Sequence, residues 1–82
     1  MTPCEELKRL RESFHLDHKQ LERMSFIEWR TIKRLENGGA KLTHEQAVAL
    51  TSGLNRYHPD ELTIYDVFPE TYTKEARDEK SA

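Results

Sequence analysis

The sequence lacks the features of disulfide-bonded, membrane-spanning and secreted proteins. Its single cysteine, Cys4, has no partner for a disulfide within the chain. No apolar run approaches the length of about eighteen residues that a membrane helix needs. Glu5 and Glu6 stand where the apolar part of a signal peptide would begin. These absences favour a protein that is neither secreted nor membrane-bound, in a reducing cytoplasm.

The sequence also lacks the residue sets that catalysis and metal binding need. Cys4 has no neighbouring histidine, and His15 and His18 have no third ligand at a suitable spacing. No glycine-rich loop could hold a phosphate. With 82 residues, of which 35% are hydrophobic, one small domain with a small core is expected. We therefore expect no enzyme, no cofactor and no metal site.

The charge is distributed unevenly along the chain. The net charge is −2, which by itself argues against a nucleic-acid-binding protein. Residues 7–34, however, carry eight basic and four acidic side chains, whereas residues 58–82 carry three basic and seven acidic ones. A basic face on an acidic protein can still bind an anionic polymer. Mixed charges on solvated helices would explain the same composition.

The periodicity of apolar residues predicts short helices, because the three glycines and three prolines fall between periodic stretches. Three helix starts combine a capping residue with Glu or Gln three positions later. They are Thr2 with Glu5, Asp17 with Gln20, and Thr43 with Gln46. A third helix should end at Asn37-Gly38, and a fifth should run from residues 58–61 to Pro69. We predict an all-α protein, with a folded domain at 1–68 and a polar, flexible tail at 69–82.

The predicted core consists of thirteen apolar side chains on the inner faces of these helices. They are Leu7, Leu10, Phe14, Leu16, Leu21, Met24, Ile27, Ile32, Leu35, Ala47, Leu50, Leu54 and Leu62.

Residues 16–38 place a short helix, a tight turn and a second short helix in sequence. The positions that form a recognisable register are Leu7, Leu10, Arg11, Leu16, Asp17, Leu21, Ile32, Leu35, Glu36, Asn37, Gly38, Leu50, Leu54, Asp60, Glu61 and Leu62. In this register the chain resembles the Cro/CI-type helix-turn-helix family of phage repressors and related bacterial regulators. The resemblance implies a five-helix bundle of the lambda-repressor type with a central helix-turn-helix. It also implies a structural ion pair between Arg11 and Glu36.

The resemblance places the third helix in the major groove of double-stranded DNA. The expected base-contacting residues lie on its exposed side: Glu28, Trp29, Arg30 and Arg34. Arginine can pair with guanine O6 and N7, and Glu can accept from cytosine N4. The expected contacts to the DNA backbone are His18, Lys19, Lys33, Gly39 and Lys41. Two alternatives to these DNA contacts stay open. Trp29 would instead belong to the core or to a dimer contact, and Arg30 and Arg34 would form a solvated helix face.

Two residues depart from the pattern of the family. Glu22 stands where the family usually has alanine, and Phe26 stands where the turn usually has a glycine with positive φ. A bulky side chain disfavours that backbone conformation. Ser25 with Glu28 forms a further capping box, which would start the third helix early. We therefore expect the turn between the second and third helices to differ from that of the family. Such a difference would change the direction in which the side chains of Trp29 and Arg30 point.

We predict a sequence-specific transcriptional regulator of the phage or mobile-element repressor type, acting as a homodimer on an inverted-repeat operator. The predicted dimer interface is the fifth helix, through Ile64, Tyr65, Val67 and Phe68, because these residues exceed what a small core needs. The alternative is an antitoxin or a protein-interaction module on the same fold. It would have weak or no DNA binding and a protein partner held by the C-terminal region.

Overall fold

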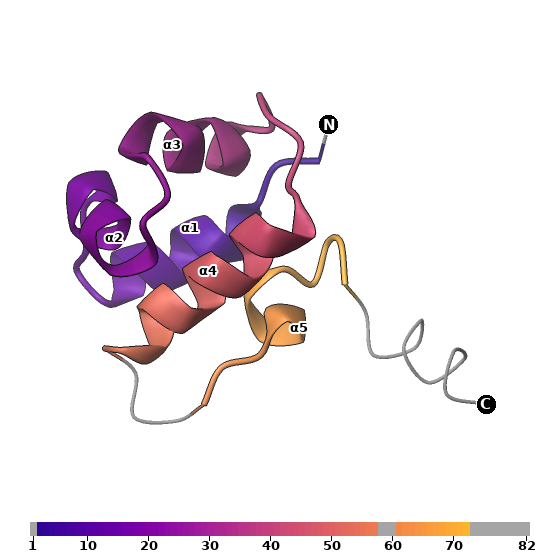
Figure 1. Cartoon of the computed structure of the whole chain (residues 1–82). Coiled ribbons are helices and arrows are strands. Elements are labelled where there is room, and N and C mark those ends of the chain that lie inside the picture. The colour runs from indigo at the N-terminus through magenta and orange to yellow at the C-terminus, as the bar shows by residue number, and fades with distance from the viewer. Residues whose placement is uncertain (1, 58–60, 73–82) are drawn as a thin grey trace.

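The computed structural model describes residues 2–57 and 61–72, and α-helix is the only regular secondary structure in these ranges (Figure 1). The all-α prediction is confirmed. None of the helices in these ranges is long and apolar enough to cross a membrane. The helices are α1 (Glu5–Ser13), α2 (His18–Ser25), α3 (Trp29–Asn37), α4 (His44–Asn55) and α5 (Ile64–Val67).

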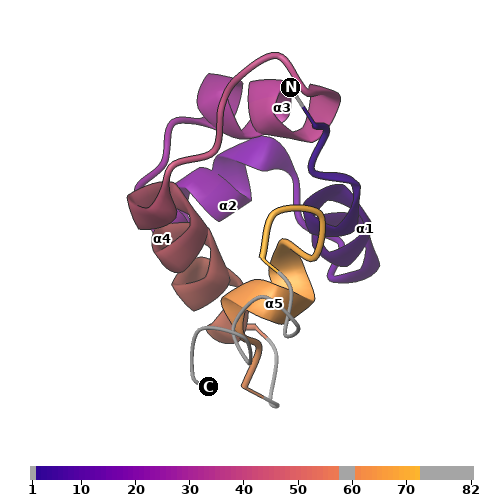
Figure 2. The same ribbon diagram turned by 90° about the vertical axis from the view of Figure 1, so that its right-hand side faces the viewer.

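The helices enclose a central core. Helix α3 lies at one end of the molecule and α5 at the opposite end, while α1 and α4 lie on opposite sides (Figures 1 and 2). Helix α2 packs against both α3 and α4, and α1 packs against α3 and α5. This arrangement leaves the outer side of α3 uncovered by any other described helix.

The core holds most of the predicted side chains and three others. Phe14, Met24, Ile27 and Leu62 are half-buried, and the other predicted core residues are buried. The additional members are Cys4, Val67 and Phe68. Val67 and Phe68 have no exposed surface, so their predicted place in a dimer interface is wrong. The short helix α5, which packs against α1 and α4, places both in the core.

The helix starts follow local capping bonds. The predicted boxes at Asp17 and Thr43 are confirmed, because each side chain accepts from the backbone N–H three residues on. Helix α1 instead begins at Glu5, two residues after the predicted start near Pro3. Cys4 is in the capping position with no side-chain cap, so the predicted capping box of Thr2 with Glu5 is wrong.

Helix α5 begins later than predicted. Thr63 and Asp66 form a reciprocal capping box that starts α5 at Ile64, rather than at residues 58–61. Before it, the Asn55 side chain bonds both backbone groups of Leu62, at 2.7 and 3.0 Å. These bonds hold the chain extended up to Thr63. Residues 58–60 lie outside the described ranges.

Residues 69–72 lie against the helices, although the sequence assigned them to the tail. The backbone N–H groups of Thr71 and Tyr72 donate to the carbonyl of Phe68. The Glu70 carboxylate accepts from the backbone N–H of Glu6, and Tyr72 contacts His44. Residues 73–82 of the predicted tail lie outside the described ranges.

Helices α2 and α4 approach most closely at Gly53. A Cβ atom added there would lie 3.1 Å from Cβ of Ser25 and 3.2 Å from its Cα and N. These atoms belong to the backbone of α2 or are attached to it directly, so they cannot move aside cheaply. Gly53 therefore sets the distance between α2 and α4, and through α2 the position of α3.

Replacing Gly53 by alanine should destabilise the fold by about 2 kcal/mol, because overpacking outweighs the better helix propensity of alanine. The measurement is urea unfolding followed by circular dichroism. Gly39→Ala is the matched control, since its added Cβ would meet nothing nearer than 3.7 Å. Equal midpoints for the two variants would contradict the close approach at Gly53.

Cys4 provides a test that depends on pH. Burial raises the pKa of the Cys4 thiol from 9.0 to about 11, and the charges of Glu70 and Glu36 add to the effect. The folded state thus holds this proton more tightly than the unfolded state. The contribution of Cys4 to the free energy of unfolding is complete below about pH 9 and is lost as the pH rises to about 11.

The check is the slope of the unfolding free energy against pH, compared between the natural chain and Cys4→Ala. The slope should be more negative in the natural chain between these pH values. Identical slopes would show that the thiol titrates alike in the folded and unfolded states.

Candidate nucleic-acid interface

A buried ion pair connects α1 to the C-terminal half of α3. The Arg11 guanidinium donates to both carboxylate oxygens of Glu36, at 2.7 and 3.1 Å. It also donates to the carbonyl of Leu16, between α1 and α2, at 2.8 Å. Both side chains are buried, so loss of either partner would leave an unpaired charge at about 3–5 kcal/mol. This is the pair that the family resemblance implies.

His18 takes part in the same cluster. Its Nε2 lies 3.0 Å from a carboxylate oxygen of Glu36, and the Nε2–H donates because an ionised carboxylate can only accept. This contact binds the start of α2 to α3. It engages one of the two ring nitrogens, so the predicted DNA-backbone contact of His18 would have to use Nδ1. Eighteen residues separate His18 from Glu36, and no sequence spacing signals the contact.

The connection between α2 and α3 is residues 26–28, and Phe26 has an unusual backbone. Phe26 ends α2 in the left-handed conformation, at φ 63° and ψ 18°, with its N–H donating to the carbonyl of Glu22 at 2.8 Å. Its side chain is 83% exposed. The chain therefore takes the turn that glycine favours, with a bulky side chain in its place, and holds that side chain in solvent.

The Ser25–Glu28 capping box does not form. Ser25 is the last residue of α2, and its hydroxyl donates to the carbonyl of Leu21 at 2.8 Å. The same oxygen accepts from the backbone N–H of Ile27 at 3.2 Å. Helix α3 consequently begins at Trp29, not early at Ser25.

Glu22 caps the N-terminus of α3 from the neighbouring helix. Its carboxylate accepts from the backbone N–H of Trp29 at 3.2 Å, whereas the capping residue Glu28 makes no side-chain cap bond. A negative charge is favourable at this end of a helix, where backbone N–H groups lack partners. Glu22, which departs from the family's usual alanine, thus orients the start of α3.

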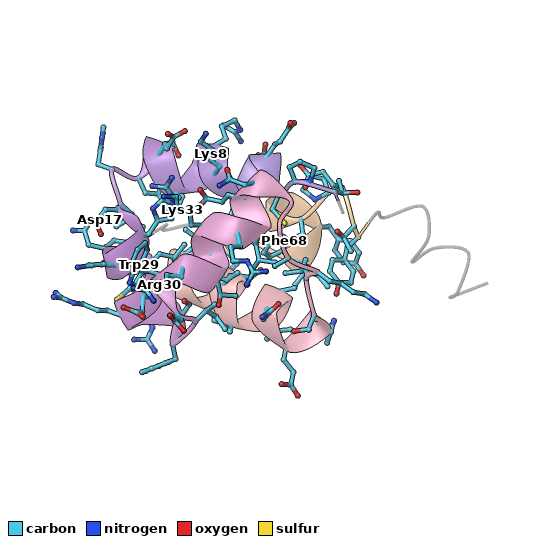
Figure 3. All side chains as sticks on the ribbon, turned by 90° about the horizontal axis from the view of Figure 1, so that it is seen from above. Lys8, Asp17, Trp29, Arg30, Lys33 and Phe68 are labelled. Carbon is cyan, nitrogen blue, oxygen red and sulfur yellow. The ribbon has the colours of Figure 1, made fainter. Side chains whose placement is uncertain are left out.

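The outer side of α3 carries the residues predicted to contact DNA. Glu28, Arg30, Lys33 and Arg34 are exposed, and Trp29 is half-buried. Ile32 and Leu35 point into the core. Figure 3 looks onto α3 and shows Trp29 and Arg30 close together, with Lys33 nearby. The Arg30 guanidinium carbon lies over the Trp29 ring, 5.3 Å from its centroid.

Arg34 lies at the other end of this surface. Its guanidinium donates to the carbonyl of Gly39 at 3.1 Å, and the N–H of Gly39 donates back to the carbonyl of Arg34 at 2.7 Å. These bonds fold the loop after α3 onto the helix end. The N–H of Gly39 is therefore not available to a phosphate. Arg30 and Arg34 lie about one helical turn apart on α3, but the Arg34 guanidinium is bonded to the loop after the helix, whereas the Arg30 guanidinium lies over Trp29.

Three lysines predicted to contact the DNA backbone are exposed: Lys19 on α2, Lys33 on α3 and Lys41 after α3. None of them forms an ion pair with another described residue. Within residues 2–57 and 61–72, no three His, Cys, Asp or Glu side chains are close enough together to hold a metal ion. Exposed cations of this kind suit contact with an extended anion.

No protein-family model matches the chain, and no curated protein or solved structure does either.

The strain at Phe26 gives a direct prediction. Phe26→Gly should raise the free energy of unfolding by about 1 kcal/mol, because glycine adopts positive φ without a steric penalty. Phe26→Ala is the control, since it removes the aromatic ring but keeps the strained backbone. The measurement is urea unfolding of both variants. A loss of stability in Phe26→Gly would show that the exposed ring stabilises the fold.

Proposed function

We propose that the protein is a sequence-specific DNA-binding regulator of transcription, in which α2 and α3 form a helix-turn-helix and α3 enters the major groove. One observation carries the proposal: α3 presents Trp29, Arg30 and Lys33 outward while its inner side and both ends are fixed. An α-helix fits the major groove, and its first residues then face the base edges.

The charges of the outer surface support this function. Lys19, Lys33 and Lys41 are exposed cations on α2, α3 and the following loop. Neutralising phosphates with such residues releases counterions and supplies the sequence-independent part of binding. The acidic residues of 58–82 lower non-specific attraction to DNA, so binding should depend more on base contacts than in a uniformly basic protein.

The resemblance to the Cro/CI-type family points the same way. It implied the Arg11–Glu36 pair, which the structure contains. We propose on this basis that the bundle is of the lambda-repressor type and that the protein represses transcription as a homodimer on an inverted repeat. Of the residues expected at the dimer interface, Ile64 and Tyr65 are half-buried and remain candidates.

A second function, as a protein-interaction module or antitoxin, is favoured by one observation. Phe26 is a large apolar side chain that is 83% exposed on strained backbone. Strained residues cluster at functional sites, and aromatic side chains are common anchors of protein interfaces. In this alternative the same fold binds a protein, with weak or no DNA binding.

Selection of bound sequences from random duplex DNA, at two salt concentrations, should enrich a defined motif. On the selected duplex, Arg30→Ala should weaken binding by about 1–3 kcal/mol and relax the preference at one base pair. Lys19→Ala should weaken binding to all sequences and lower the slope of log affinity against log salt by about one. Arg34→Ala should cost less than Arg30→Ala, because Arg34 is bonded to Gly39.

The matched control is Arg56→Ala. Arg56 is exposed at the end of α4 away from α3, so its loss should leave affinity unchanged (Figures 1 and 2). No enrichment at low salt would refute DNA binding and leave the interaction module as the function. If a motif is enriched but Arg30→Ala binds it with the affinity of the natural chain, the DNA lies on another surface.

A further inference from the structure

Trp29 and Arg30 form one unit at the start of α3. The guanidinium carbon of Arg30 lies 5.3 Å from the centroid of the Trp29 ring, within the range of a cation–π contact. Arg30 is exposed, so the N–H groups of its guanidinium stay open to a ligand. These N–H groups are the donors that pair with O6 and N7 of guanine.

The unit is held in place before any ligand binds. The backbone N–H of Trp29 donates to the Glu22 carboxylate, and the Trp29 side chain is half-buried. Arg30 is exposed, and its guanidinium contacts the indole of Trp29. This contact restricts a long side chain in advance and reduces the entropy that would otherwise be lost on binding. Trp29 is therefore a positioning residue for Arg30.

Trp29 and Arg30 together reach more than one base pair. The separation of 5.3 Å between the guanidinium carbon and the ring centroid exceeds the rise of about 3.4 Å between base pairs. When the Arg30 guanidinium pairs with a guanine, the indole can therefore lie at the level of a neighbouring base pair. The indole is apolar, and the apolar group that bases present in the major groove is the C5-methyl of thymine.

We propose that Trp29 and Arg30 together read two neighbouring base pairs, a guanine through Arg30 and the methyl group of a thymine through Trp29. This inference rests on the proposed function and deepens it by naming the DNA sequence that the start of α3 selects. It gives Trp29 two roles, which are contact with the methyl group and orientation of Arg30.

The test uses the full chain and the duplex obtained by selection, whose motif should contain a guanine next to a thymine. Two modified duplexes each remove one group: 7-deazaguanine removes N7, and deoxyuridine removes the methyl. For the natural chain, the first change should weaken binding about fivefold or more, and the second about fourfold. Affinities are measured by fluorescence anisotropy.

The variants are Arg30→Ala and Trp29→Leu. In Arg30→Ala, which removes the guanidinium at an exposed position, the 7-deazaguanine penalty should fall below twofold. In Trp29→Leu the deoxyuridine penalty should fall, and the 7-deazaguanine penalty should fall with it because Arg30 is no longer oriented. Circular dichroism establishes that Trp29→Leu is folded, and Arg30→Ala tests the guanine contact if it is not. Lys33→Ala is the control, which should weaken all duplexes alike.

The outcomes separate this inference from the function on which it rests. A selected motif without a guanine next to a thymine overturns the inference and leaves DNA binding intact. Unchanged penalties in both variants do the same. If the Arg30 variant lowers only the 7-deazaguanine penalty and Trp29→Leu lowers only the deoxyuridine penalty, the two side chains act separately. Their coupling is then refuted. Failure to select any duplex overturns the proposed function and the inference together.

Discussion

The position of α3 depends on the buried bonds between Arg11 and Glu36. The guanidinium links three parts of the chain, because it also donates to the carbonyl of Leu16, and His18 adds the start of α2. Burying two charges costs desolvation energy, so the pair is not primarily a source of stability. What it provides is orientation: the carboxylate accepts from directions fixed by α1 and α2, which sets where the C-terminal half of α3 lies.

The other end of α3 is fixed by different contacts. Glu22 caps the N-terminus of α3, and the close approach of Gly53 to Ser25 seats α2 on α4. With both ends held, the outward residues have a fixed relation to one another and to α2. A rigid presentation of this kind is what recognition of a base sequence needs, because hydrogen-bond donors must match base edges to within a fraction of an ångström. The same rigidity explains why Phe26 can be kept in a strained conformation.

Sequence reasoning succeeded where a local bond decides the structure. The capping boxes at Asp17 and Thr43 join residues three positions apart, and the left-handed Gly38 ends α3, so spacing alone predicts them. It failed where a competing bond exists. Ser25 was available to cap α3 but bonds Leu21 instead. Val67 and Phe68 were taken for surplus apolar residues because a four-residue helix gives no periodicity from which an inner side can be read.

The sequence by itself determined the all-helical class, most of the core and the face of α3 that carries Trp29, Arg30 and Lys33. These follow from apolar periodicity and local capping, which act over a few residues. Only the tertiary structure decided which polar groups are already hydrogen-bonded within the protein. His18 meets Glu36, Arg34 meets Gly39 and Glu22 meets Trp29, and each bond changes what the residue can offer to a ligand. The physical reason is that side-chain hydrogen bonds between helices depend on how the helices pack, and no short spacing in the sequence encodes that packing.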